Sequence, residues 1–399
     1  MQRVTTLEKI YQYLLISLAF LLPLTVFGGN LIIVIIVMIW AFSGGYKSKI
    51  EKILSSKLLL ASIVFFIIHL IGLFWTEDMQ WGLHIVKKMW YFLLLLPILW
   101  TIVNSQYIKY YLSAFLLAIS FTELCSYLVW FEIIEPFKNA TVENPTPFMS
   151  HISYNPILAF SIYLVAHELI HTKKFSKLKY IMYSFFVITM TFNMFITGGR
   201  AGQIMFFVMI SILIFQYFQN QKLKAFLIML VLVPSIFFIA YQASNLFNER
   251  VDAAIQNILT YDQDKNTSVG ERLTFAINSW EIIKQNLFIG VGTGDFPLQY
   301  RKVNQINSAE LLTTTNPHNM YTLVTVQLGI FGLLSMLSIF YMQIKLSFQN
   351  NNKFFRDVGI TLPLLYLVIM WSDSYLLGHY TTLLFIFFSS FLYKNFEEN

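Results

Sequence analysis

Long apolar stretches recur along nearly the whole chain and leave little polar sequence between them. Twelve of them approach the length needed to cross the hydrocarbon core of a bilayer, about 30 Å or roughly twenty helical residues. Several are short, so the pattern predicts an all-α integral membrane protein with about twelve transmembrane helices, between roughly eleven and thirteen. The stretches lie near residues 11–27, 29–44, 58–76, 90–104, 108–131, 150–170, 180–197, 201–219, 225–243, 318–346, 358–377 and 379–394.

The longest polar segment separates the ninth apolar stretch from the tenth. We therefore expect three parts: residues 1–243 with nine helices, a large extramembrane loop at 244–317, and residues 318–399 with three more helices. Within the loop, apolar side chains recur at helical spacing between residues 245 and 260. This pattern is typical of an amphipathic helix that lies at a membrane surface.

A second loop helix is predicted from Ser268-Val-Gly-Glu271, which has the spacing of a capping box. Its first turn then contains Arg272, at a place where unpaired backbone N–H groups and the helix dipole favour an anion. Farther along, Gly290-Val-Gly-Thr-Gly294 has the glycine content of a turn that cradles phosphate, a weak signal by itself.

The loop ends in Asn316-Pro-His-Asn319. Asparagine is a common N-cap and proline a common first helical residue, so the tenth helix is expected to begin here, with His318 in its opening turn. The positive helix end favours the neutral imidazole, which is the form that a general base needs. Asp373, near the outer end of the eleventh stretch, is expected either to join helices or to contact a sugar.

Composition agrees with lipid as the main solvent. Hydrophobic residues make up 57% of the 399 residues and charged residues only 12%. The net charge of +6 gives no indication of nucleic-acid binding, because most basic residues fit the positive-inside rule. Seventeen of the 27 basic residues fall inside when both termini are inside, which predicts N-in and C-in. They are Arg3, Lys9, Lys47, Lys49, Lys52, Lys57, Lys109, Lys173, Lys174, Lys177, Lys179, Lys222, Lys224, Lys345, Lys353, Arg356 and Lys394.

The few arginines are distributed differently from the lysines. Only six of the 27 basic residues are arginine, and four of these, Arg200, Arg250, Arg272 and Arg301, fall in outside segments. The planar guanidinium suits bidentate contact with phosphate or carboxylate. By contrast, the single Cys125 and the spacing of the histidines give no indication of a metal site, and we expect no metal and no cofactor.

Several of these motifs together resemble the signature of bacterial O-antigen ligases and the related O-antigen polymerases. His318-Asn319 is followed after nine residues by Gly329-Ile-Phe-Gly332. Upstream, and in the family's order, the chain has Gly-Leu-Phe-Trp-Thr-Glu-Asp before a Lys-Lys pair, Thr-Gly-Gly-Arg200, Glu-Arg272 and Gly-Val-Gly-Thr-Gly-Asp-Phe. The resemblance covers nearly the whole chain.

The resemblance implies a GT-C-like membrane enzyme of lipopolysaccharide biosynthesis in the bacterial inner membrane. Its donor would be an undecaprenyl-pyrophosphate-linked glycan and its acceptor the lipid A–core oligosaccharide, on the periplasmic face and without a metal. Arg200 and Arg272 match the arginines that hold the pyrophosphate, and His318 matches the essential histidine. We expect these three residues to converge above the bilayer.

The roles of individual residues stay open at this point. His318 is expected either to act as a base, typically worth about 10²–10⁴-fold in rate, or to hydrogen-bond the pyrophosphate. The arginines are expected to stabilise the leaving group. The additional candidates for substrate binding are Asn319, Arg301, Lys87, Lys88 and Asp373.

Two other functions compete with the ligase. An O-antigen or capsule polymerase would use a second lipid-linked glycan as acceptor, and Leu333-Leu334 stand where ligases often have small hydroxylated residues, which leaves this choice open. A polysaccharide transporter would also have about twelve helices, but transporters usually show internal repeats, and none is evident here. The oligomeric state is not determined by the sequence.

Overall fold

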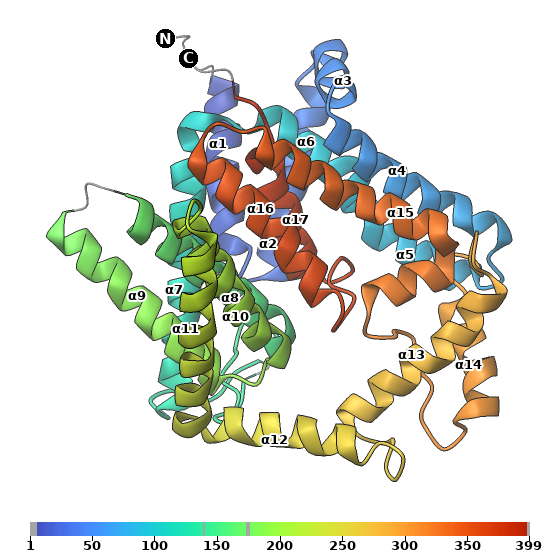
Figure 1. Ribbon diagram of the computed structural model, residues 1–399. Helices are drawn as coiled ribbons and strands as arrows, with labels where there is room; N and C mark the ends of the chain where they lie inside the picture. The colour runs from blue at the N-terminus through green and yellow to red at the C-terminus, as the bar shows by residue number, and fades with distance from the viewer. Residues whose placement is uncertain (1–5, 139, 173–175, 397–399) are drawn as a thin grey trace. The chain divides into compact units, whose positions relative to one another are not determined.

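The computed structural model describes residues 6–138, 140–172 and 176–396 (Figure 1). Every regular element in these ranges is a helix. Each of the twelve predicted apolar stretches coincides with helical structure, and the amphipathic helix predicted at 245–260 is confirmed as α12 (Asn245–Leu259). Three basic residues used for the predicted orientation, Arg3, Lys173 and Lys174, lie outside the described residues.

The chain divides into two compact units, each described here by itself. Unit 1 comprises Met1–Val34 and Asn104–Asp252, and unit 2 comprises Ile35–Val103 and Ala253–Asn399. Two helices, α2 (Val26–Phe42) and α12, contain a boundary between the units.

Unit 1 is built around α8 (His151–His171). An unbroken run of α8 residues, from Tyr154 to Val165, is buried, as expected for a helix that is surrounded on all sides. It packs against α9 and α10, while α11 packs along α10 and α1 along α7. The bounds of these helices are α1 (Thr6–Leu21), η3 (Ser105–Tyr107), α7 (Ile108–Trp130), α9 (Lys177–Ile196), α10 (Arg200–Tyr217) and α11 (Lys222–Ala243).

Unit 2 is built around α15 (Met320–Phe348), which packs along α4 and α16. A second core helix, α17 (His379–Leu392), packs against α6 and is buried at every position from Thr381 to Leu392. The bounds of the other helices are α3 (Tyr46–Leu54), α4 (Lys57–Ile71), η1 (Gly72–Trp75), α5 (Met79–Trp90), the π-helical η2 (Tyr91–Leu95), α6 (Leu96–Ile102), α13 (Ser268–Gln285), α14 (Phe296–Asn307) and α16 (Lys353–Ile369).

Seven helical segments among the described residues are long and apolar enough to cross a membrane. The bent pair of α2 and α3, with an angle of 116° between them, makes an eighth if it counts as one span. Shorter helices such as α17 occupy other predicted stretches, so multiple spans are supported, whereas the predicted number of twelve stays a prediction. The seven are Lys57–Trp75, Met79–Ile102, Ser105–Trp130, Lys177–Ile196, Arg200–Tyr217, Lys222–Ala243 and Met320–Phe348.

A kink at Gly329 interrupts α15, where φ is 62° and ψ is −159°. The next residue, Ile330, donates its N–H to the Leu287 carbonyl at 2.8 Å, outside the helix. A Cβ at Gly329 would lie 2.2 Å from the Phe288 carbonyl oxygen. Only glycine combines this backbone conformation with so close an approach, so the kink depends on this residue.

Candidate functional site

The segment before α15 differs from the expected helix start. The helix begins at Met320, and its N-cap is Asn319, whose side-chain oxygen accepts the Thr322 N–H at 3.0 Å. The predictions that Asn316 caps this helix and that His318 lies in its first turn are therefore wrong. Both asparagines fit the preference for a cap, but Asn316 uses its side chain in other hydrogen bonds.

His318 lies directly before the helix, and its Nδ1 is 3.3 Å from Oδ1 of Asp373. Because α16 ends at Ile369, Asp373 belongs to the connection between α16 and α17 and lies beyond the end of the helix that was predicted to contain it. The side chain of His318 is 35% exposed and that of Asp373 18%. The pair is therefore partly shielded from water, while the imidazole stays accessible to a substrate.

The ionisation of Asp373 decides which imidazole nitrogen carries the proton. Burial acts to raise the pKa of this carboxyl, but His318, through a hydrogen bond and its charge, the Ser374 backbone N–H and the Asn316 amide together lower the pKa below its usual value of 3.8. At neutral pH the carboxylate only accepts hydrogen bonds, so Nδ1 of His318 must donate. Nε2 is then the nitrogen with the lone pair and can take a proton from a substrate.

Asn316 joins the two sides of this pair. Its side-chain nitrogen donates to Asp373 Oδ1 at 3.1 Å, and its side-chain oxygen accepts the His318 N–H at 3.0 Å and the Ser374 hydroxyl at 2.8 Å. The Ser374 N–H donates to the same Asp373 oxygen at 2.7 Å. These bonds fasten the segment that carries His318 to the connection after α16.

The backbone of His318 is left-handed, with φ of 52°. For a residue other than glycine this conformation costs of order 1–3 kcal/mol, and it persists where the surroundings fix it. Here the N–H is held by Asn316, the ring by Asp373, and one ring face stacks on Phe275 of α13, with centroids 6.1 Å apart and planes inclined by 25°. Contacts with Asn316, Asp373 and Phe275 thus hold His318 in one orientation.

The start of α13 is one residue earlier than a cap at Ser268 would place it. Thr267 is the N-cap and accepts the Gly270 N–H at 3.0 Å, so the predicted capping box is wrong. Arg272 is the fifth residue of the helix, beyond the first turn in which the helix dipole acts most strongly. What remains for binding an anion at this position is the exposed guanidinium itself.

Arg272 lies within electrostatic reach of the connection that carries Asp373. Burial raises the pKa of the Tyr375 hydroxyl to about 12, and the positive charge of Arg272 acts against this rise. Tyr375 is two residues after Asp373. Unit 2 therefore places a guanidinium in the neighbourhood of the His318–Asp373 pair.

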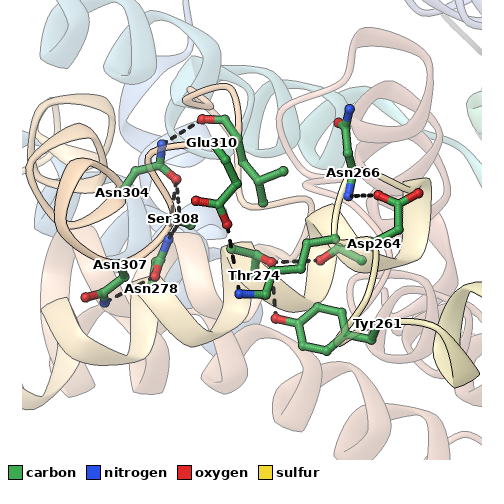
Figure 2. Close-up of polar contacts among 12 residues, drawn as sticks. Tyr261, Asp264, Asn266, Thr274, Asn278, Asn304, Asn307, Ser308 and Glu310 are labelled. Carbon is green, nitrogen blue, oxygen red and sulfur yellow. Dashed lines mark hydrogen bonds and ion pairs between the residues drawn. The ribbon is translucent and has the colours of Figure 1, made fainter.

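A buried polar network fixes α13 relative to the segment that leads to His318 (Figure 2). Asn278 of α13 donates to the Ser308 hydroxyl at 2.8 Å, and that hydroxyl donates to the Asn304 side-chain oxygen of α14 at 2.8 Å. All three residues are buried, so each hydrogen bond is made without competition from water. The network sets the position of the helix that carries Arg272.

The glycine-rich loop 290–294 does not bind phosphate as its composition suggested. All five of its backbone N–H groups donate hydrogen bonds within unit 2, and a phosphate would have to break them. The expectation of a phosphate-cradling turn is therefore wrong. The acceptors are the carbonyls of Asn286, Val326, Gln327 and Gly72 and the side-chain oxygen of Thr76.

The residue that follows this loop reinforces that conclusion. Asp295 is fully buried, and its two carboxylate oxygens accept the N–H groups of Glu77 and Asp78 at 2.8 Å each. Asp295 therefore ties the end of this loop to the turn between η1 and α5. The motif joins the kink of α15 to the turn between η1 and α5, and its role is structural.

In unit 1, Arg200 is the first residue of α10 and is half-buried. The first turn of α10 packs directly on α8, because a Cβ at Gly202 would lie 2.2 Å from Cβ of Asn155. Asn155 is fully buried and accepts the Thr197 hydroxyl at 3.0 Å. Close packing of α10 on α8 therefore fixes where α10 begins and from which point the Arg200 side chain extends.

The other predicted substrate-binding residues lie in unit 2 with the His318–Asp373 pair. Besides capping α15, Asn319 donates to the Trp371 carbonyl at 3.4 Å. Arg301 is exposed on α14, and Lys87 and Lys88 are in the last turn of α5. Their binding roles stay predictions.

Three residues around His318 were not predicted as part of the site. Asn316 and Ser374 hydrogen-bond Asp373, and Phe275 stacks on the imidazole. The only signal for Asn316 was its place two residues before the histidine, where it fitted a helix cap equally well. Ser374 and Phe275 gave no signal, because their proximity depends on the packing of three elements.

No curated protein matches the chain. The model of one protein family, described as O-antigen ligase, matches residues 185–337, a stretch that contains Arg200, Arg272 and His318, and this match confirms for that stretch the resemblance to the O-antigen ligase superfamily.

Proposed function

We propose that the protein is an O-antigen ligase, which transfers a polysaccharide from undecaprenyl pyrophosphate to lipid A–core oligosaccharide on the periplasmic face of the inner membrane. The observation that carries the proposal is the His318–Asp373 pair, at 3.3 Å, with Arg272 in electrostatic reach of the same connection. This pair supplies a base and this arginine a cation, the two groups that such a transfer needs.

In the proposed reaction an acceptor hydroxyl oxygen attacks the anomeric carbon of the donor glycan. The bond between that carbon and the pyrophosphate oxygen breaks, and the pyrophosphate leaves with the electron pair. The hydroxyl proton goes to Nε2 of His318, and the imidazolium that forms is stabilised by Asp373 through Nδ1. The guanidinium of Arg272 binds the charge that gathers on the departing pyrophosphate.

Arg200 is proposed separately, as a ligand of the donor pyrophosphate. Its support is local: a half-buried arginine at the start of α10, held by the packing of Gly202 on Asn155. A half-buried guanidinium binds an anion more strongly than an exposed one, because water screens it less. The roles of Asn319, Arg301, Lys87 and Lys88 as substrate ligands are proposed on the resemblance.

The test is transfer by the purified protein from a lipid-linked donor to three acceptors: lipid A–core, a second lipid-linked glycan, and a peptide. We expect transfer to lipid A–core. Transfer only to the second lipid-linked glycan would make the protein a polymerase, and donor release without any transfer would favour neither enzyme. The absence of turnover with all three acceptors would contradict the proposed function.

Two variants test the assigned residues. Asparagine tolerates a left-handed backbone, so His318→Asn removes the base without adding strain, and we expect a rate loss of about 10²–10⁴-fold. Arg272→Ala should also slow transfer, whereas Lys284→Ala, an exposed cation on the same helix, is the matched control and should not. Wild-type rates in both His318→Asn and Arg272→Ala would refute the assignment.

A further inference from the structure

Arg250 lies against the turn that precedes Arg200 in unit 1. It belongs to α12, and its Nη2 is 3.5 Å from the place where a Cβ of Gly198 would stand, which is ordinary van der Waals distance. Gly198 is two residues before Arg200. The guanidinium of Arg250 therefore reaches the turn that leads into Arg200, the first residue of α10.

Among the described residues, none accepts a hydrogen bond from the Arg250 guanidinium. Within the part of the chain that the structure describes, no carboxylate pairs with it and no side chain accepts a hydrogen bond from it, although it is half-buried. Asp252, on the same helix, accepts the Tyr241 hydroxyl at 2.7 Å. The guanidinium of Arg250 therefore keeps its hydrogen-bond donors available for an anion.

The side chains that lie beside this turn, besides Arg250, include an amide and an imidazole. Asn144 accepts the Gly198 N–H at 3.0 Å and contacts Nδ1 of His151 at 2.8 Å, and His151 interacts electrostatically with Arg250. The N-terminus of α10 adds backbone N–H groups without a side-chain cap, because its N-cap is Gly199. The Arg250 charge and the uncapped N–H groups of α10 favour a negative charge at this turn.

We propose that Arg250 and Arg200 together bind one phosphate group at the turn between α9 and α10, and that this phosphate belongs to the donor. The inference rests on the proposed function, in which Arg200 binds the donor pyrophosphate, and it adds a second ligand in unit 1. The planar fork of Arg250 suits two parallel hydrogen bonds to phosphate oxygens, which a lysine could not provide. Arg250 binds the ground state and takes no part in proton transfer.

The same chemistry would suit the phosphate of a membrane phospholipid, so the experiment compares two sources. Binding of undecaprenyl pyrophosphate to the purified full chain is measured by native mass spectrometry, with phosphatidylglycerol as competitor. We expect Arg250→Ala to weaken binding at least about tenfold, the loss of one charge-assisted pair. Arg250→Lys should recover part of it, because it restores the charge without the fork. Equal competition by phosphatidylglycerol would overturn the assignment to the donor.

Glu249→Ala, next to Arg250 on the exposed side of α12, is the matched control and should bind as wild type does. In steady-state kinetics, Arg250→Ala should raise KM for the donor and leave kcat within about twofold, as expected for uniform binding. If the wild-type protein transfers the glycan and the Arg250→Ala variant binds the donor as tightly as wild type does, this inference alone is refuted. If the wild-type protein transfers to no acceptor, the proposed function fails, while the binding measurement still decides the role of Arg250. Should Arg250→Ala misfold, Arg250→Lys and Arg250→Gln provide the same comparison.

Discussion

Among the described residues, the imidazole of His318 makes its hydrogen bond through Nδ1, and its partner is a carboxylate that is ionised at neutral pH. In the proposed reaction, Asp373 is therefore a positioning residue, which sets the tautomer and the ring orientation of His318. The strained backbone, with φ of 52°, is a second sign that this orientation is imposed by the fold. Both properties belong to single residues, and both can be tested by substitution.

Asp373→Asn should lower the transfer rate by roughly 10²-fold, at the low end of what a general base contributes. The amide is nearly isosteric, but it removes the charge that stabilises the imidazolium and it permits the wrong tautomer. Initial rates with saturating donor and acceptor measure the effect, and His318→Asn sets the lower limit. Asp373→Asn with an unchanged rate would show that Nδ1 needs no carboxylate.

The lowered pKa of Asp373 predicts how its stabilising effect depends on pH. A carboxyl whose pKa is lower in the folded state than in the unfolded state stabilises the fold above the unfolded value, near 3.8, and loses this effect as pH falls through the folded value. The difference in melting temperature between wild type and Asp373→Asn should thus be constant from neutral pH to about pH 4. It should shrink only below that pH. Differential scanning fluorimetry in detergent measures it, and a difference that vanishes already near pH 6 would contradict the prediction.

At the scale of elements, glycine contacts determine the bend of α15. Gly290 and Gly329 stand where neighbouring backbones approach closely: a Cβ at Gly290 would lie 2.4 Å from the Gln327 carbonyl group. The loop 287–294 and the kink therefore hold each other in place. A sequence pattern shows the glycines, but it does not show whether their N–H groups face a ligand or another backbone.

Gly329→Ala should destabilise the protein more than Gly44→Ala does. Both glycines have positive φ, but Gly44 has no atom within 4 Å of a new Cβ, whereas at Gly329 the methyl group would meet the Phe288 carbonyl at 2.2 Å. Gly44→Ala thus reports the cost of a positive φ without a steric clash, about 1–2 kcal/mol. Thermal unfolding in detergent compares the two, and equal losses would show that the kink relaxes without cost.

The network around Asn278 should be needed to order the segment before His318. Asn278→Ala leaves buried polar partners unsatisfied, a cost of about 1–3 kcal/mol. Hydrogen exchange in residues 308–311 should become faster, while Asn266→Ala, whose side chain is exposed, serves as the control (Figure 2). If hydrogen exchange in residues 308–311 is as slow in Asn278→Ala as in wild type, other contacts hold this segment in place.

The sequence predicted the helices well and the site only in outline. Apolar runs are long, so α8, α11 and α15 were recognisable from composition alone. The caps were misplaced by one to three residues, because several residues in a row, such as Thr267 and Ser268, satisfy the same preference. The contacts of Asp373 with Asn316 and Phe275 with His318 join segments distant in the chain, and no local pattern encodes them.

At the scale of the whole molecule, the predicted orientation can be tested with the single cysteine. Cys125 is buried in α7, so a Cys125→Ala background removes the only competing thiol. Gln263→Cys in the loop 244–317 should react with a membrane-impermeant maleimide from the periplasmic side. Asn351→Cys, exposed between α15 and α16, should react only after the membrane is opened. The reverse pattern would invert the topology.

The bend at Gly329 divides α15 into two parts and so sets the distance between the second part and His318. The part of α15 after it, Ile330–Phe348, is long enough to cross the bilayer, at about 28 Å. The part before it, Met320–Leu328, is about 13 Å of helix that separates the kink from His318. Shortening this part by one turn should therefore move His318 by about 5 Å relative to the kink and break its contact with Asp373, which belongs to the connection after α16.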